Sequence, residues 1–212
     1  KNCRRSLRER SMNFLNVFEA IHSLRTIRRF RLDPVRDEDI RTILEAATKA
    51  PSSHNRQPWR FLVIRDEGLK REVARLYHKS WWAKRRDEGV HSAGDIRSDD
   101  RVTLSAMYLA EHIQEAPVII LVCLTSPRAY SSIYPAVQNL LLAARGLGLG
   151  TTPATLHPIV KDEIQALLEM PEEVEVATCI PLGYPRGRFG PTKRRPVEEV
   201  TYYDKWDNPP PW

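Results

Sequence analysis

The chain has 212 residues, of which 42% are hydrophobic and 28% charged, and its formal net charge is +6. These values suit one globular domain with a real core and exclude a disordered chain. No apolar run approaches the roughly 20 residues that span a membrane, and the first residues lack the apolar segment of a signal peptide. We therefore expect a cytoplasmic protein without a membrane partner, with a basic tail over residues 1–12 and one domain with a C-terminal extension over residues 13–212.

Helical and extended patterns alternate along the domain without a strict β-α-β rhythm. Helical periodicity or composition predicts helices over residues 13–24, 34–51, 68–86, 101–114, 134–146 and 161–170. Strands are predicted over residues 59–64, 117–124 and 174–184, and residues 198–206 are typical of an edge strand. The unbroken apolar run VIILVCL predicts an interior strand covered on both faces. This mixture predicts an α+β domain.

Several common site signatures are absent from the sequence. Cys123 and Cys179 lie in apolar strand patterns, so we expect buried, reduced thiols. No C-x-x-C or H-E-x-x-H spacing occurs, which predicts no protein-bound metal. GLGLG at residues 146–150 follows a helix instead of opening one, so we interpret it as a helix end closed by Gly146 and not as a dinucleotide fingerprint.

Two basic segments remain open to two interpretations. LRTIRRF contains Arg25, Thr26, Arg28 and Arg29, and TKRRP covers residues 192–196. Arginine forks beside a hydroxyl group make a phosphate cradle, but the same residues also suit a solvated basic turn. Neither segment is specific when taken alone.

The loop APSSHNRQPWRF, from Ala50 to Phe61, has an unusual composition for a connection between a helix and a strand. Pro51 and Pro58 restrict the backbone, and Trp59 is suited to anchoring the exit in the core. The polar side chains between the prolines include Ser52, Ser53, Asn55 and Gln57. Such a rigid set of donors and acceptors suits recognition of a flat heterocycle with a polar edge.

Four successive segments resemble the signatures of the FMN-dependent nitroreductase family: RTIRRF, LEAATKAPSSHNRQPWRFLVI, NLLLAARGLGLGTT and IPLGYPRGRFGPTKRRPVEEV. Their order and spacing match over roughly residues 13–204. The resemblance implies a central, mainly antiparallel sheet surrounded by helices in an intertwined homodimer. It also implies FMN at two sites in the dimer interface, each built from both subunits.

The resemblance assigns the cofactor-binding residues. Arg25 and Thr26 would hold the FMN phosphate and ribityl end, Lys193 and Arg194 would complete the phosphate cradle, and Arg28 would lie near the flavin pyrimidine edge. Residues that would reach the flavin of the other subunit are Pro51, Ser52, Ser53 and Asn55, supported by Gln57. The segment implied to run past the flavin ring is Pro153, Ala154 and Thr155.

The chain departs from the family pattern in its first motif, where Leu24 replaces the first member of an arginine pair. Arg29 or Lys193 is a candidate to compensate for the missing charge. Trp81 and Trp82 are candidates to wall the substrate pocket, and the alternative is that they are ordinary core or interface tryptophans.

The implied activity is ping-pong reduction of a nitroaromatic, quinone or related acceptor with NADPH or NADH. Chemistry at the flavin N5 requires no catalytic side chain. The alternatives are a specialised relative, either a reductive dehalogenase or an FMN-fragmenting enzyme; the dehalogenase Glu…Tyr…Lys lid pattern is not found here. A basic nucleic-acid-binding protein on a flavin fold is the third hypothesis. FMN phosphate accounts for two of the three basic clusters, so no nucleic-acid partner is expected.

Overall fold

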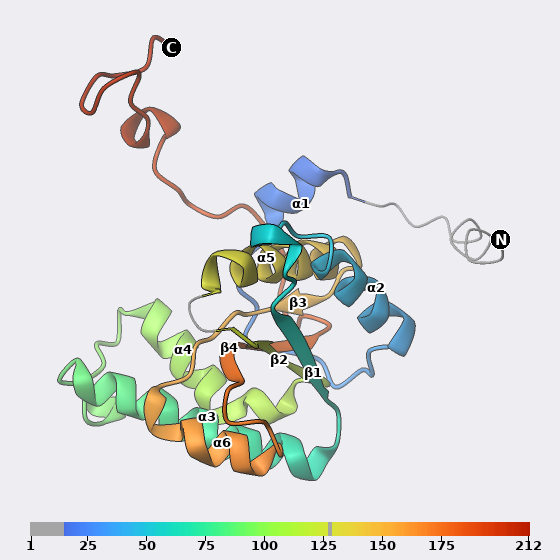
Figure 1. The fold of residues 1–212 in the computed structure, drawn as a ribbon. Helices are drawn as coiled ribbons and strands as arrows, with labels where there is room; N and C mark the ends of the chain where they lie inside the picture. Colours follow the sequence, from blue (N-terminus) through green and yellow to red (C-terminus); the bar gives the residue numbers. More distant parts are fainter. Residues whose placement is uncertain (1–14, 127–128) are drawn as a thin grey trace, which may run out of the picture.

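The computed structural model describes residues 15–126 and 129–212. A four-stranded antiparallel sheet, in the order β1-β2-β4-β3, lies between two groups of helices (Figure 1). The strands are β1 (Trp59–Ile64), β2 (Val118–Leu124), β3 (Gly150–Thr151) and β4 (Glu175–Gly183). The helices are α1 (Val17–Ser23), α2 (Asp37–Ala47), α3 (Glu67–Asp87), α4 (Arg101–His112), α5 (Tyr130–Gly146) and α6 (Lys161–Leu167). The predicted α+β class with a mainly antiparallel sheet is confirmed.

Strand β2 divides the hydrophobic core into two parts. Successive side chains of a strand point to opposite faces of the sheet. Val118, Ile120, Val122 and Leu124 belong to the core beneath α2 and α5, whereas Ile119, Leu121 and Cys123 belong to the core that α3 and α4 share. Every residue of β2 is buried, so the predicted interior strand is confirmed.

The predicted burial of the two strand cysteines is also confirmed, since Cys123 and Cys179 are both buried thiols. Desolvation raises the pKa of Cys123 to about 11 and that of Cys179 to about 12. The neighbouring Cys123 adds to the effect on Cys179. Thiolate chemistry is therefore disfavoured at both positions.

Helix α5 ends at Gly146, but its capping glycine lies two residues beyond the predicted one. Gly146 is the last helical residue, and the left-handed residue is Gly148, with φ of 75°. The amide of Leu149 donates to the carbonyl of Ala144 at 2.8 Å, and the amide of Gly148 donates to that of Arg145 at 3.0 Å. This pair of bonds is a Schellman motif, so the capping glycine is Gly148 and not Gly146.

The prediction of an edge strand over residues 198–206 is wrong. Residues Val197–Val200 form a short 3₁₀ helix, η5, and turns follow. A strand needs a neighbour to pair with, and this C-terminal segment runs away from the sheet (Figure 1). Local bonds replace pairing: the Tyr203 amide donates to the Asn208 carbonyl at 2.8 Å. The predicted tail over residues 1–12 lies outside the described residues.

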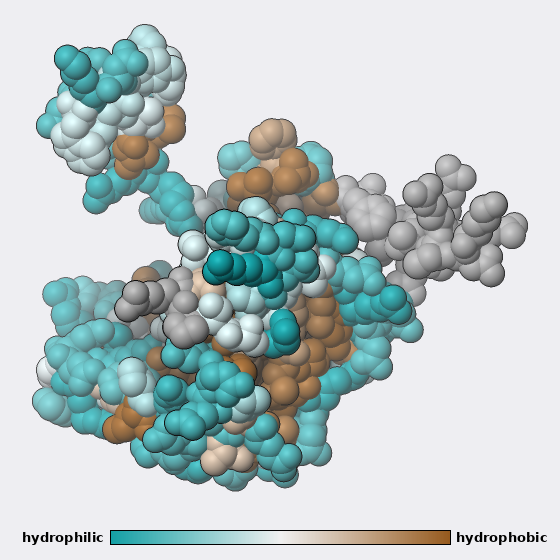
Figure 2. Space-filling model, in the orientation of Figure 1, coloured by the Kyte–Doolittle hydropathy of each residue, from teal (hydrophilic) through white to brown (hydrophobic). Residues whose placement is uncertain are grey.

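Apolar side chains also gather on the surface. Val17, Phe18 and Ile21 of α1 are 59%, 70% and 47% exposed, and Figure 2 shows this helix as a brown patch. In the described ranges, no helix has the length and apolar character needed to cross a membrane.

Gly150 allows a close approach of two chain segments at the start of β3. A Cβ atom at this position would lie 2.7–2.9 Å from three atoms of the Ile27 side chain. Ile27 is buried, and its amide donates to the carbonyl of Thr151 at 2.9 Å. The glycine therefore seats the segment around Ile27 against the sheet.

Replacing Gly150 by alanine is expected to lower the free energy of unfolding by about 1–3 kcal/mol, because overpacking displaces Ile27. Urea unfolding measures the change. Gly146→Ala is the matched control, since no atom lies within 4 Å of its Cβ position. Alanine there is expected to leave stability unchanged or raise it by up to about 1 kcal/mol. Equal stabilities of the Gly150→Ala variant and the parent would contradict the close contact.

Candidate functional site

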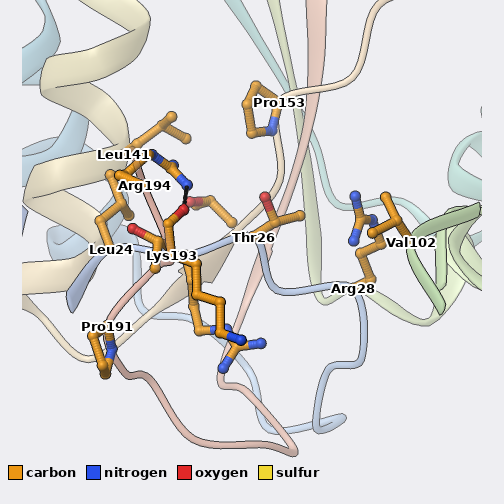
Figure 3. Close-up of a pocket in the computed structure, with 12 residues that line it drawn as sticks. Leu24, Thr26, Arg28, Val102, Leu141, Pro153, Pro191, Lys193 and Arg194 are labelled. Carbon is orange, nitrogen blue, oxygen red and sulfur yellow. Dashed lines mark hydrogen bonds between the residues drawn. The ribbon is translucent and has the colours of Figure 1, made fainter. Parts of the chain in front are cut away.

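A cavity of about 520 Å³ opens between the segment before α2, the N-terminus of α4, the β3 region and the arm after residue 190 (Figure 3). Its lining residues are Leu24, Arg25, Thr26, Arg28, Val102, Leu141, Thr151, Pro153, Pro191, Thr192, Lys193 and Arg194. The predicted site residues Arg25, Thr26, Arg28, Pro153, Lys193 and Arg194 are thus brought together from three distant parts of the sequence.

The backbone on either side of Ile27 is fixed by hydrogen bonds to the β3 region. Besides the bond from Ile27 to Thr151, the hydroxyl of Thr152 donates to the Ile27 carbonyl. Further along, the amide of Arg31 donates to the Tyr184 carbonyl at 2.8 Å, and Phe30 forms a β-bridge with Pro185. The residues on each side of Ile27 are therefore presented to the cavity from a well-anchored backbone.

The lining carries four basic side chains, Arg25, Arg28, Lys193 and Arg194, and no carboxylate. Figure 3 shows Lys193 and Arg194 on one side of Thr26 and Arg28 with Val102 on the other. The cavity thus has a cationic end near the arm and a second, separate cation near α4. Such an arrangement suits an elongated anionic ligand.

Arg28 is half-buried at the α4 end of the cavity. Its Nη1 donates to the hydroxyl of Ser105 at 3.3 Å, which is a long hydrogen bond to an uncharged acceptor. Burial lowers the pKa of Arg28, and Tyr77 acts in the opposite direction. A guanidinium held without a carboxylate partner among the described residues is available to a ligand.

The cations at the arm end of the cavity are exposed and form few hydrogen bonds or ion pairs with the described residues. Arg194 Nη1 donates to the Lys193 carbonyl at 2.9 Å, as the dashed line in Figure 3 shows. Arg25 and Lys193 form no ion pair with any described carboxylate. Arg29, one candidate for the missing charge of the family pair, lies outside the lining, with its guanidinium 3.7 Å from the centre of the Tyr108 ring.

The predicted segment from Pro153 to Thr155 passes from the cavity toward α3. Ala154 pairs with Cys179, with backbone bonds of 2.9 and 2.7 Å, and the Thr178 hydroxyl donates to the Ala154 carbonyl at 3.0 Å. Pro153 lines the cavity, whereas Ala154 and Thr155 lie just beyond it. The sheet thus fixes the path of this segment.

The loop from Pro51 to Gln57 does not line the cavity of its own chain. Its backbone is strained: His54, Asn55 and Gln57 adopt left-handed conformations with φ of 52°, 54° and 49°. Residues other than glycine rarely occupy this region, and such strain clusters at functional sites.

Hydrogen bonds within and beneath the loop hold this strained shape. The Gln57 amide donates to the Ser52 hydroxyl at 3.1 Å, and Gln57 Nε2 donates to Asn55 Oδ1 at 3.0 Å. The Ser53 amide donates to the hydroxyl of Ser132 on α5 at 3.2 Å. Trp59 is 5% exposed, which confirms it as the anchor at the loop exit.

Sequence reasoning missed the apolar side of the cavity. Val102 on α4 and Leu141 on α5 lie far from the motifs and follow ordinary helical patterns, so no local signal marks them. The two tryptophans proposed as pocket walls do not line this cavity. Trp81 is buried in the core, with its ring centroid 4.9 Å from that of Trp82, as expected for the alternative of structural tryptophans.

Comparisons with known proteins identify the family to which the chain is similar. A family model described as the nitroreductase family matches residues 21–184. The chain is 33% identical to iodotyrosine deiodinase from Thermotoga neapolitana, over 87% of this chain and 95% of that protein. It is 29% identical to NADH dehydrogenase from Thermus thermophilus, over 92% of this chain and 99% of that protein.

A solved structure extends the likeness to three dimensions. The crystal structure of oxidized iodotyrosine deiodinase bound to FMN and 3-iodo-L-tyrosine matches with a TM-score of 0.71 at 29% identity. The match covers 90% of this chain and 99% of that chain. The family resemblance read from the four sequence segments is confirmed, and this chain belongs to the nitroreductase family.

Proposed function

We propose that this protein is an FMN-dependent oxidoreductase that takes a hydride from NADH or NADPH and reduces nitroaromatic, quinone or related acceptors. The observation that carries the proposal is the cavity itself, with four basic side chains and no carboxylate in its lining. A phosphate-bearing cofactor matches this charge, and relatives of known structure support FMN as that cofactor.

The lining residues suit FMN in charge and in hydrogen-bonding capacity. Arg25, Lys193 and Arg194 would hold the phosphate, which accepts charge-assisted hydrogen bonds from guanidinium and ammonium groups. Thr26 would bond the ribityl chain. Pro153 would lie along the flavin ring with the segment that follows it.

Arg28 would act on the flavin electronically. A bound flavin supplies hydride transfer between a reduced nicotinamide and an acceptor. A fixed cation beside the ring stabilises the negative charge that develops on reduction, because it needs no reorganisation at that moment. The weak contact with Ser105 leaves Arg28 free for this role.

The second part of the proposal is that two subunits build each site. The predicted loop residues lie outside the cavity of their own chain: Pro51, Ser52, Ser53, Asn55 and Gln57. Asn55 and Gln57 nevertheless hold a strained, left-handed backbone in the single chain. The exposed apolar face of α1 and the C-terminal residues Trp206 and Trp212, which are 80% and 60% exposed, support association with a second copy.

Reductive dehalogenation is a second candidate, supported by the 33% identity to an iodotyrosine deiodinase. Under this alternative, the reduced protein would convert 3-iodo-L-tyrosine to tyrosine and iodide. Chromatography of a reaction with 3-iodo-L-tyrosine and a nitroaromatic acceptor, each alone, separates the two candidates by the product formed.

Purified protein loaded with FMN is expected to bleach when NADPH or NADH is added without oxygen, and to regain its colour with a nitroaromatic acceptor. Because donor and acceptor use one flavin face in turn, initial rates are expected to give parallel double-reciprocal lines. Stopped-flow absorbance and steady-state rates measure both. A flavin that neither nicotinamide reduces would refute the proposed reductase.

Arg194→Ala is expected to weaken FMN binding by about tenfold to over a hundredfold, because hydrogen bonds to charged groups contribute about 1.5–3 kcal/mol. Fluorescence titration of the protein after removal of bound flavin measures the dissociation constant. Arg195→Ala is the control, since Arg195 lies outside the lining. Equal losses in the two variants would indicate a general charge effect instead of a phosphate contact.

A mixed dimer tests the shared site. One chain carries Arg194→Ala and the other carries Asn55→Trp, and two different tags isolate the heterodimer. If each site combines both chains, the two defects fall in one site, so about one FMN per dimer binds tightly with about half the activity. If each site used one chain, both sites would be damaged, and a heterodimer without tight FMN would rule out the shared site. Each parental homodimer is expected to bind FMN poorly.

A further inference from the structure

Two half-buried cations near the C-terminus of α3, Lys84 and Arg85, are not used by the proposed flavin site. They lie beside the segment that leaves the cavity at Pro153. Lys84 Nζ donates to the hydroxyl of Thr155 at 2.7 Å and also to the Thr155 carbonyl. The short helix η4 (Pro158–Val160), which follows this segment, packs against α3.

Neutral oxygens hold the ammonium of Lys84. Both of its acceptors are neutral oxygens of Thr155, and no described carboxylate pairs with it. Burial lowers the pKa of Lys84, the adjacent Arg85 lowers it further, and Glu88 acts in the opposite direction. A half-buried ammonium held only by neutral groups is unfavourable for the fold, so packing alone does not explain it.

Arg85 also has a hydrogen-bonding group that the described residues do not use. Its Nη2 bonds Glu88 Oε1 at 2.8 Å, and its guanidinium lies 5.5 Å from the centre of the Trp81 ring. Its Nε is buried and has no acceptor among the described residues. Buried donors nearly always have a partner, so the Arg85 guanidinium keeps hydrogen-bonding capacity that the described residues do not use.

The nearby carboxylates are already engaged. Asp87 Oδ2 lies 3.0 Å from His157 Nε2, and the Ile159 amide donates to the other ring nitrogen of His157. Glu88 pairs with Arg85 from a position that is 56% exposed. Glu88 acts on Lys84 only through space, and no described acidic side chain of this turn forms a hydrogen-bonded ion pair with it.

We infer that Lys84 and Arg85 form a subsite for an oxyanion on the electron acceptor, such as a carboxylate or sulfonate attached to an aromatic ring. The inference rests on the proposed reductase function and specifies its substrate class. An ammonium and a guanidinium on adjacent residues provide a point charge and a planar fork for one oxyanion. The Trp81 ring beneath Arg85 supports the guanidinium through a cation–π contact.

Binding to the oxidised, FMN-loaded protein tests the subsite without turnover. The probes are 4-nitrobenzoate and its uncharged analogue 4-nitrobenzamide, titrated by calorimetry. The parent is expected to bind the benzoate more tightly. Lys84→Gln and Arg85→Gln are each expected to raise the Kd of the benzoate by about tenfold or more, because each removes a charge-assisted bond, and to change that of the amide by less than about threefold.

Three further variants separate charge from structure. Arg71→Gln removes an exposed cation from α3 and is expected to leave both Kd values unchanged. Lys84→Arg and Arg85→Lys keep the charge and are expected to retain the preference for the benzoate, which a purely structural role would not restore. If one glutamine variant fails to fold, the test rests on the parent's preference for the benzoate over the amide and on the Kd values of the other glutamine variant.

Several outcomes overturn the inference. Equal Kd values for the two probes in the parent would do so, and so would equal losses for both probes in the glutamine variants. The donor also carries phosphates, so flavin reduction by NADPH is measured in each variant. Slower reduction by NADPH with unchanged benzoate binding would assign the cations to the donor. A parent that binds the benzoate but shows no flavin reduction would instead refute the reductase proposal and leave the anion subsite standing.

Discussion

The contact between Ile27 and the bare backbone of Gly150 determines where the cavity lies. The Ile27 side chain occupies the space that a Cβ atom at residue 150 would need. The contact requires β3 to begin immediately after α5, and the left-handed Gly148 provides that reversal of direction. The end of α5 thus determines where Ile27 packs. The hydrogen bonds of the Ile27 backbone to Thr151 and Thr152 then fix the backbone that carries the neighbouring arginines.

The loop after α2 differs from the Ile27 segment, because little burial of its side chains stabilises its conformation. Left-handed conformations at residues other than glycine cost on the order of 1–3 kcal/mol each. His54, Asn55 and Gln57 are all exposed, so packing of these side chains does not offset that cost in the single chain. Pro51 and the hydrogen bonds of Ser52 hold the form nonetheless. A strained and exposed loop is consistent with a binding surface that contacts another molecule, as in the proposed site shared between two subunits.

The sequence predicted the elements whose signals are local and missed those that depend on distant packing. The apolar run of β2 predicts its burial because a strand covered on both faces has no polar side. The segment around Tyr203 has strand composition but pairs with no strand among the described residues, so composition alone misled the assignment. Val102 and Leu141 join one cavity from separate helices, and no spacing links them. The cationic residues were predictable because the family motifs carry them.

Charge explains why the fold accepts a cavity of this kind. Arg25, Arg28, Lys193 and Arg194 repel one another across a space without a carboxylate, and such self-repulsion weakens a compact state. An anionic ligand that binds only the folded state reverses this effect and stabilises the protein in proportion to its occupancy. Lys84 of α3 bonds Thr155, two residues after Pro153, so positive charge extends past the cavity toward α3. An anionic acceptor would add a charged partner at the α3 end of this arrangement, where Lys84 bonds only the neutral oxygens of Thr155.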